Sequence, residues 1–333
     1  MTTQAGAGIT IGLSVHSIID PRWERDVTEI PSQARQMGVK LLLENASSSA
    51  IRQIQQCEKL LADGVQALII LAQDGSASSK AVEMANARGV PVIAYERMIL
   101  NCDLPLYVGF DTAKVGEQLC RYALQHAPRG NYIILDGDAK DNNAVILRQV
   151  RQKMMKAAIE SGQIQPVLES WVDGWSMSLA WQLTRDALKK NPQIACVLAA
   201  SDNLAEGASQ ALHDMKMQGS VVVTGQDAVL SAVVRILQGQ QTMSIYKPIP
   251  LLAKTVMECA IALVNKKPVL STRAIDNGKR SVASVLINEL PVVDKNNAIE
   301  VVTGPLGSYT SQQIYSRLPQ ALRPTGTEAV LGR

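Results

Sequence analysis

The chain has 333 residues, of which 47% are hydrophobic and 19% are charged, and its formal net charge is +3. This length allows two domains, and this composition is that of a folded protein rather than a disordered one. Because lysine and arginine form no cluster, nucleic acid is not expected as a partner. No stretch approaches the ~20 consecutive apolar residues of a membrane span. The low aromatic content of 4% predicts a mainly aliphatic core.

The cysteines and histidines show no spacing typical of a metal site. The five cysteines are scattered without a Cys-x-x-Cys pair, and the three histidines are far apart in the sequence. We therefore expect buried cysteines without disulfides, and no bound metal. Residues 1–8 have neither the basic head nor the apolar segment of a signal peptide, so we expect either a cytoplasmic protein or one whose signal has been removed.

Apolar runs typical of strands alternate with helical patterns in the first part of the chain. The run at 65–71 is continuously apolar, as in a strand buried on both faces. The helical pattern at 49–62 places its apolar residues on one face. The expected strands are 9–15, 39–43, 65–71 and 90–95, and the expected helices are 23–37, 49–62 and 76–88.

The same alternation begins again after residue 130. Segment 193–202 resembles segment 65–74, which indicates that the two parts have similar folds. The order of elements predicts an α/β fold with two similar doubly wound parallel-sheet lobes. The expected strands are 131–135, 166–169, 194–200, 221–224, 281–287 and 299–303, and the expected helices are 144–161, 178–190, 204–217 and 250–265.

No Pro/Gly/Ser-rich linker separates the lobes, so we expect the chain to cross between them several times. The connection would then be a hinge made of several strands. The N-terminal lobe is expected to comprise 9–111 plus 249–283, the C-terminal lobe 112–248 plus 284–322, and a tail 323–333.

Polar and aromatic side chains follow the predicted strands in both lobes. In open α/β sheets, ligands bind beyond the carboxyl ends of the strands, so these side chains are candidates for a ligand site. Carboxylates, amides, arginine and lysine hydrogen-bond to hydroxyl groups, and a tryptophan face suits the apolar face of a pyranose. The pattern therefore predicts a monosaccharide pocket between the two lobes. The residues concerned include His16, Asp20, Arg22, Trp23, Gln73, Asp74, Glu96, Arg97, Asp136, Asp138, 141–143, 171–175, 201–203, 225–227 and Lys247.

Each of these motifs also has a purely structural interpretation. Asp141 precedes a helical pattern and is a good helix N-cap, and Trp171 is best explained by core packing. The convergence at equivalent strand ends of both lobes favours a binding role for the set. The glycines at 6–12 precede a strand instead of following one, so they are not a dinucleotide fingerprint. The sequence has no P-loop and no Gly-x-Ser-x-Gly elbow. Pairs of Asp and Glu could act as acid and base, but no cluster of histidine, cysteine or metal ligands accompanies them. We therefore expect no enzymatic activity and no cofactor.

Through these residues the sequence resembles the periplasmic sugar-binding proteins of ABC transporters with the type I fold. Within that family it looks like the D-xylose-binding subfamily, from about residue 9 to about residue 302. The most specific matching segments are Trp-Val-Asp-Gly-Trp at 171–175 and Gly-Gln-Asp-Ala at 225–228. Further matches are Arg22-Trp23 with Asp26, 95–99, 110–111, 114–117, 130–132, 141–144, 241–243 and 246–249.

The resemblance implies a role for each matching side chain. Arginines would donate to sugar oxygens, acidic and amide groups would bind hydroxyls, a lysine would reach in near the hinge, and Trp23 and Trp175 would sandwich the ring. Asp26, Trp171 and Trp181 would be structural. The candidate ligand-binding residues are Arg22, Trp23, Glu96, Arg97, Asp141, Asn143, Trp175, Ser201, Asp227 and Lys247.

The sequence departs from the subfamily at three places. Ser201 stands where an amide is typical, Glu96 stands where aspartate is typical, and 16–19 lacks the acidic character expected after the first strand. Losing one amide partner can change discrimination between sugars by a few kcal/mol. The sugar class is therefore expected, while D-xylose, another pentose, a hexose and a polyol all stay open.

The resemblance implies a solute-binding protein that closes about its hinge around a monosaccharide and presents the closed form to a membrane permease. It implies a periplasmic location with the signal peptide removed, no cofactor, and a monomeric state. The alternatives are a sugar-sensing extracytoplasmic partner of a signalling receptor, a sugar-converting enzyme, and an interaction protein without a small ligand. A sugar-responsive repressor does not fit, because the first strand begins too early for a preceding helix-turn-helix.

Overall fold

In the computed structural model, which describes residues 6–18 and 21–323, the chain divides into two units. Unit 1 consists of the chain up to Asp111 together with Ile249–Asn288, and unit 2 consists of Thr112–Pro248 together with the chain from Glu289 onward. The chain thus passes from one unit to the other three times, as the expected multi-strand connection requires.

The expected boundary between residues 283 and 284 falls inside strand β13 (Ser281–Ile287). This strand pairs with β5 (Leu106–Phe110) in a continuous parallel register from Ala283 to Ile287. Because the whole strand belongs to the sheet of unit 1, the units divide after Asn288 instead. Of the expected tail, residues 324–333 lie outside the described residues.

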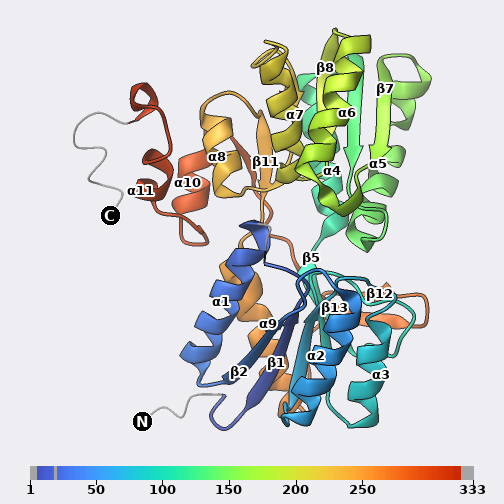
Figure 1. The fold of residues 1–333 in the computed structure, drawn as a ribbon, viewed down its shortest axis with the longest axis vertical. Helices are drawn as coiled ribbons and strands as arrows, with labels where there is room; N and C mark the ends of the chain where they lie inside the picture. The colour runs from blue at the N-terminus through green and yellow to red at the C-terminus, as the bar shows by residue number, and fades with distance from the viewer. Residues whose placement is uncertain (1–5, 19–20, 324–333) are drawn as a thin grey trace. The chain divides into compact units, whose positions relative to one another are not determined.

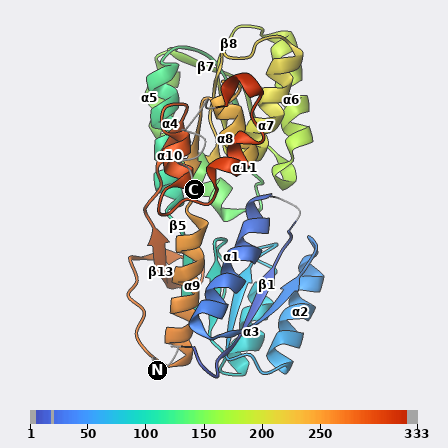
Figure 2. The same ribbon diagram turned by 90° about the vertical axis from the view of Figure 1, so that its left-hand side faces the viewer.

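Unit 1 is a seven-stranded sheet in the order β12-β13-β5-β4-β3-β1-β2, with helices on both faces (Figure 1). All neighbouring strands are parallel except β12 and β13. Helices α1 and α9 pack against each other on one face (Figure 2), and α2 and α3 lie together on the other. The remaining strands are β1 (Thr10–Val15), β2 (Lys40–Asn45), β3 (Ala67–Leu71), β4 (Val92–Tyr95) and β12 (Arg273–Asp276). The helices are α1 (Pro21–Met37), α2 (Ala50–Ala62), α3 (Ser79–Ala87) and α9 (Ile249–Val264).

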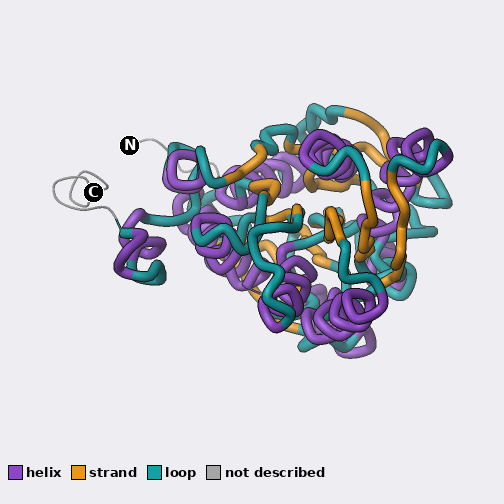
Figure 3. Tube along the Cα trace, turned by 90° about the horizontal axis from the view of Figure 1, so that it is seen from above, coloured by secondary structure: helices purple, strands orange, loops and turns teal. Residues whose placement is uncertain are grey.

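Unit 2 contains a parallel four-stranded sheet in the order β7-β6-β8-β9 and a smaller sheet in the order β10-β11-β14. Helices α4 and α5 pack together, as do α6 and α7. Figure 3 colours the helices purple and the strands orange along the trace. The strands are β6 (Gly130–Asp136), β7 (Ile164–Trp171), β8 (Ile194–Ala199), β9 (Val222–Val223), β10 (Gln226–Asp227), β11 (Met243–Tyr246) and β14 (Val292–Asp294). The helices are α4 (Thr112–His126), α5 (Asn142–Glu160), α6 (Met177–Lys190), α7 (Asp202–Asp214), α8 (Leu230–Leu237), α10 (Ala298–Thr303) and α11 (Ser311–Tyr315), with 3₁₀ turns η1 (Asp173–Trp175) and η2 (Gln320–Leu322).

The two units share a strand order. The run β2-β1-β3-β4 of unit 1 corresponds to β7-β6-β8-β9 of unit 2. In both, the first strand of the unit lies inside the sheet between its second and third strands. This arrangement confirms the predicted α/β fold with two similar, mainly parallel, doubly wound lobes.

The strand predicted at 299–303 is wrong, because these residues form helix α10. The run Ile-Glu-Val-Val-Thr has high strand propensity, but propensity is a weak local preference that packing overrides. Ala298 and Val302 are four residues apart, so they share one face of the helix. Both are buried in a cluster with Ile314 and Leu318 of the C-terminal segment, which stabilises the helical form.

The core is mainly aliphatic, and its three aromatic side chains that are less than 2% exposed are tyrosines, one of which, Tyr95, belongs to unit 1. Each tyrosine hydroxyl donates a hydrogen bond: Tyr95 to Asp26, Tyr132 to the Ala127 carbonyl (2.7 Å) and Tyr246 to the Leu306 carbonyl (2.6 Å). All five cysteines are buried, as predicted, and they are free. Over residues 6–18 and 21–323, no helix has the length and apolarity needed to span a bilayer, and no cluster of acidic, histidine and cysteine side chains could hold a metal ion.

Candidate functional site

Arg22 is held at the start of α1 by a buried acid one helical turn away. Its guanidinium forms an ion pair with Asp26, which also accepts a hydrogen bond from the Tyr95 hydroxyl. Both charged residues are buried. Burial raises the pKa of Asp26, and the charge of Arg22 opposes that rise. The pair therefore fixes the guanidinium at the carboxyl end of β1, where the fold places ligands.

Trp23 brings the two predicted arginines of unit 1 together. The guanidinium carbon of Arg22 lies 4.6 Å from the centre of the Trp23 ring, and that of Arg97 lies 5.2 Å from it. The His16 ring packs against the same indole in a T-shaped arrangement, with the ring centres 5.0 Å apart and the planes at 80°. Cations stacked on an indole are held in place by its quadrupole. Residues from β1, α1 and the end of β4 thus converge on one aromatic side chain.

Glu96 lies beside these arginines in an unusual backbone conformation. Its φ of 63° is in the left-handed region, which is uncommon for a residue other than glycine. Its backbone N–H donates to the Val108 carbonyl (2.8 Å), and its carbonyl accepts from the Tyr107 hydroxyl (2.8 Å). A carboxylate oxygen lies 3.9 Å from Nη2 of Arg22. Unit 1 therefore brings together Arg22, Trp23, Glu96 and Arg97, whereas Asp20 lies outside the described residues.

In unit 2, Asp141 and Asn143 form the start of α5. Asp141 is the helix N-cap, and its carboxylate accepts from the backbone N–H of Asn143 (2.9 Å), so the capping interpretation is confirmed. The side-chain oxygen of Asn143 accepts from the Thr112 hydroxyl (3.1 Å). Both side chains are buried. A carboxylate and an amide are thereby held next to each other at the carboxyl end of β6.

Trp175 is positioned by a tight turn after β7. Gly174 and Trp175 both have positive φ values, 62° and 54°, and the Gly174 N–H donates to the Asp138 carboxylate (2.9 Å). The indole packs so closely on the backbone of Gly137 that a Cβ at this position would collide with the ring. The indole Nε1 is buried and has no hydrogen-bond partner among the described residues.

We expect Gly137→Ala to destabilise the protein by about 1–3 kcal/mol, because the added methyl group forces the Trp175 ring out of its place. Urea denaturation measures the change. The control is the same substitution in a Trp175→Ala background, in which the collision no longer exists and the cost is expected to disappear. An equal cost in both backgrounds would contradict the prediction.

Ser201 caps α7, and the buried acid Asp202 follows it. The Ser201 hydroxyl accepts from the Leu204 N–H (3.3 Å). Asp202 is 1% exposed and accepts from the Gln241 side chain (2.8 Å) and the Ser244 hydroxyl (2.8 Å). Burial, and after it the charge of Asp227, raise the pKa of Asp202 to about 7.

Asp227 and Lys247 form an ion pair at the ends of two parallel strands, β10 and β11. The lysine Nζ lies 3.1 Å from a carboxylate oxygen of Asp227, and their side chains are 8% and 14% exposed, respectively. Asp227 has a φ of 97°, so its side chain leaves the strand from a strained backbone. The preceding residue, Gln226, donates to the Ala200 carbonyl (2.7 Å), but its side-chain oxygen is buried without a partner among the described residues. Because Gln226 follows a predicted strand, the sequence marks it as a candidate for the ligand site. That its side-chain oxygen has no partner in the described part of the chain can be seen only in the structure.

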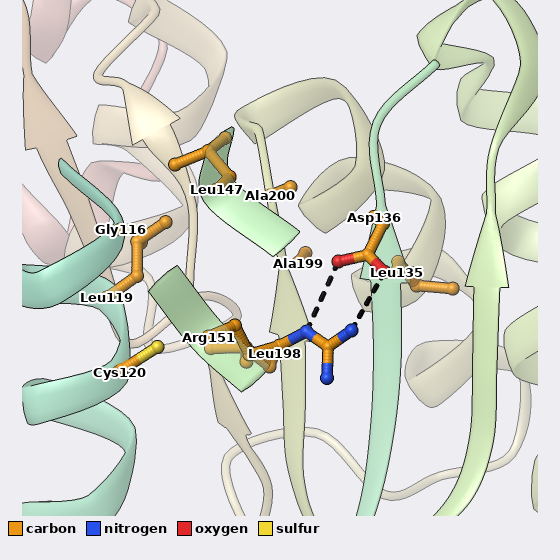
Figure 4. A pocket seen from close by; sticks show the side chains of 10 residues that line it. All are labelled: Gly116, Leu119, Cys120, Leu135, Asp136, Leu147, Arg151, Leu198, Ala199 and Ala200. Carbon is orange, nitrogen blue, oxygen red and sulfur yellow. Dashed lines mark hydrogen bonds and ion pairs between the residues drawn. The ribbon is translucent and has the colours of Figure 1, made fainter. Parts of the chain in front are cut away.

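A small internal cavity of about 20 Å³ in unit 2 is not a sugar site (Figure 4). It lies between α4, α5 and the sheet and has room for about one water molecule. Beside it, Arg151 forms an ion pair with Asp136 (3.1 Å) and another with Glu169 (2.7 Å). This network ties α5 to β6 and β7 and so anchors the helix that begins with Asn142.

Comparison with known proteins identifies similar chains over most of the length. A family model described as a periplasmic binding protein domain matches residues 11–268. The chain is 35% identical over 308 residues to the D-xylose-binding periplasmic protein of Haemophilus influenzae, covering 92% of each chain. It is 36% identical over 295 residues to the D-xylose-binding periplasmic protein of Escherichia coli, covering 88% of this chain and 89% of the relative.

Among solved structures, a carbohydrate transporter solute binding protein from Chloroflexus aurantiacus, determined in complex with D-glucose, is similar in fold and sequence. The TM-score is 0.86 and the identity is 26%, covering 93% of this chain and 98% of that one.

Proposed function

Because the chain belongs to the periplasmic binding protein family, we propose that it is the solute-binding component of a sugar ABC transporter. Its ligand would be a monosaccharide, D-xylose or a related pentose or hexose. The observation that carries the proposal is the identity of about 35% to two D-xylose-binding periplasmic proteins over most of the chain. The proposal includes a periplasmic location, a membrane permease as partner, a monomeric state and no catalytic turnover.

The chemistry of the two residue sets supports this proposal. Unit 1 supplies mainly donors, because Arg22 and Arg97 present guanidinium groups around one indole. Unit 2 supplies acceptors through Asp141, Asn143 and Asp227, and the donor Lys247. Vicinal hydroxyls of a sugar both donate and accept, and hydrogen bonds with charged partners are the stronger kind. Each set alone offers only part of what a sugar needs.

The proposed mechanism is hinge closure in which both sets bind the same sugar. The chain's three passages between the units provide the connection about which such closure would occur. In the absence of sugar, closure would bury charged and polar groups without partners, which is costly. The ligand would therefore shift the population toward the closed form, which the permease would recognise.

Ser201 and Glu96 are the proposed determinants of which sugar is bound. Ser201 is short and its oxygen already caps α7, so it reaches less far than an amide side chain would. Glu96 is longer by one methylene than the aspartate typical of the D-xylose-binding subfamily. A site that leaves a hydroxyl without a partner discriminates strongly against the sugar carrying it.

The experiment is a thermal-shift screen of the purified protein against pentoses, hexoses and polyols, followed by calorimetric titration of the best ligand. A sugar at one hundred times its Kd is expected to add about 2.7 kcal/mol of stability, which raises the Tm by a few degrees for a protein of this size. Recovery of the unchanged sugar by NMR after incubation tests the absence of turnover.

Arg97→Met is expected to weaken binding on the order of 100-fold, because charge-assisted hydrogen bonds to the sugar are lost. The matched control is Arg52→Met, which replaces an exposed arginine on α2 and leaves the affinity unchanged. If no sugar in the panel shifts the Tm, or if both variants bind equally well, the proposed function is wrong.

A further inference from the structure

We propose that His16 is a further sugar-binding residue of unit 1, whose imidazole Nε2 forms a hydrogen bond with one hydroxyl group of the bound monosaccharide. The inference rests on the proposed function and names an additional group that selects the sugar.

The first observation is an unpaired buried atom. His16 is 7% exposed, and its Nε2 has no hydrogen-bond partner within residues 6–18 and 21–323. Leaving a buried polar atom unpaired is energetically costly, so such atoms in folded proteins usually have a partner. A ligand hydroxyl that reaches Nε2 would remove this cost when it binds.

The second observation is the position of the ring. His16 directly follows β1, at the end of the strand where ligands bind in this class of fold. Its ring makes a T-shaped contact with Trp23, the indole on which Arg22 and Arg97 also lie. The imidazole, both guanidiniums and the indole thus form one compact group, and a sugar that reaches the arginines comes within reach of His16.

The third observation concerns the charge of the ring. Burial and the positive charge of Arg97, with a smaller contribution from Arg22, lower the pKa of His16 to about 3, although an interaction with the Gln73 side chain acts in the opposite direction. The imidazole is therefore neutral at physiological pH, with one ring nitrogen donating and the other accepting. A sugar hydroxyl can do either, so it can pair with Nε2 in both tautomers. A neutral ring also accommodates a neutral ligand without adding to the positive charge of the two arginines.

The test compares wild-type protein, His16→Phe and His16→Gln by calorimetric titration with the best sugar and with its set of monodeoxy analogues. In the wild type, one analogue is expected to bind about 10- to 100-fold more weakly, because it lacks the hydroxyl paired with Nε2. His16→Phe is expected to bind the parent sugar more weakly by a similar factor and to lose nothing further with that analogue. His16→Gln, which keeps a polar group at a similar reach, is expected to recover part of the affinity.

The control is His126→Phe, which changes an exposed histidine on α4 and is expected to leave every affinity unchanged. If His16→Phe weakens the parent sugar and all analogues by one common factor, His16 only supports the site and the inference is wrong. If His16→Phe does not fold, the same comparison with the apolar variant His16→Leu decides: an undiminished penalty for every deoxy analogue overturns the inference. Wild-type protein that binds no sugar overturns the proposed function itself, which is a distinguishable result.

Discussion

Arg22→Met is expected to lower the free energy of unfolding by about 3–5 kcal/mol, because it leaves the carboxylate of Asp26 buried without its counter-ion. Asp26 is completely buried, and the two groups described above as its partners are Arg22 and the Tyr95 hydroxyl. In the variant, Tyr95 is the one of these two that remains. The charge of Arg22 lowers the pKa of Asp26, so in the variant this pKa rises further above that of an unfolded chain. The folded variant then binds a proton more readily than the unfolded one, and its stability falls as the pH rises. The deficit relative to wild type is therefore expected to be larger at pH 8 than at pH 5.

Urea denaturation at both pH values measures this effect. The double variant Arg22→Met/Asp26→Asn removes the unpaired charge and is expected to recover a large part of the lost stability. The matched control is Lys59→Met, which breaks an exposed pair with Glu44 and Asp63 and is expected to change the stability little. The prediction is contradicted if Arg22→Met loses as little stability as the control, or if the double variant recovers none of the loss. Either result would show that Arg22 does not stabilise the buried Asp26 carboxylate.

The second large effect is a pair of opposing pH dependences in stability. His16 has a folded-state pKa of about 3, below its ordinary value of 6.5, so between these values the unfolded state binds more protons. Its contribution to stability is therefore lost as the pH falls from 6.5 toward 3. Asp202 has a folded-state pKa of about 7, above its ordinary 3.8, so its contribution is lost as the pH rises from about 4 to 7. Over the shared range the two slopes oppose each other.

Replacing one of the two groups removes its contribution, so the pH dependence of the variant's stability is expected to show the slope caused by the other group. The stability of wild type minus that of His16→Gln should decrease by up to about 4 kcal/mol as the pH falls from 6.5 to 3. The stability of wild type minus that of Asp202→Asn should instead decrease as the pH rises from 4 to 7. Denaturant unfolding at intervals of half a pH unit in a mixed buffer gives both differences. Parallel pH curves for wild type and either variant would falsify the assignment of that slope.

The fold could be predicted where burial on both faces produces continuous apolar runs. Strand β3 is such a run, and its five residues are all buried. The prediction failed where local preference and packing disagree, as in α10, whose β-branched residues form a helix because Ala298 and Val302 pack on one face. Strand β5 is not predicted from the sequence, although it is buried throughout, because Gly109 interrupts a short apolar run. The strand forms by parallel pairing with β4 on one side and β13 on the other.

The sequence predicts which residues belong to the candidate site, because it shows which polar and aromatic residues follow each strand. Arg22, Trp23, Glu96 and Arg97 come together in unit 1 for that reason. Whether a polar atom has a partner depends on which neighbours reach it in the fold, and the sequence carries no pattern for this. The unpaired Nε2 of His16 therefore becomes visible only in the structure.

The order in which the chain is synthesised has a consequence for how the protein acquires its fold. Unit 1 begins at the N-terminus but is completed by Ile249–Asn288, which follow most of unit 2 on the ribosome. Helix α9 supplies a row of buried apolar residues, among them Leu252, Val256 and Met257, that pack on α1 and on the sheet of unit 1. Until α9 has emerged, the face of this sheet that α9 shares with α1 is covered only by α1, and its remaining apolar surface is exposed to aggregation or to chaperones. A truncated chain ending before Ile249 would keep that vulnerability permanently, so unit 1 cannot be obtained as an independent fragment by a single cut.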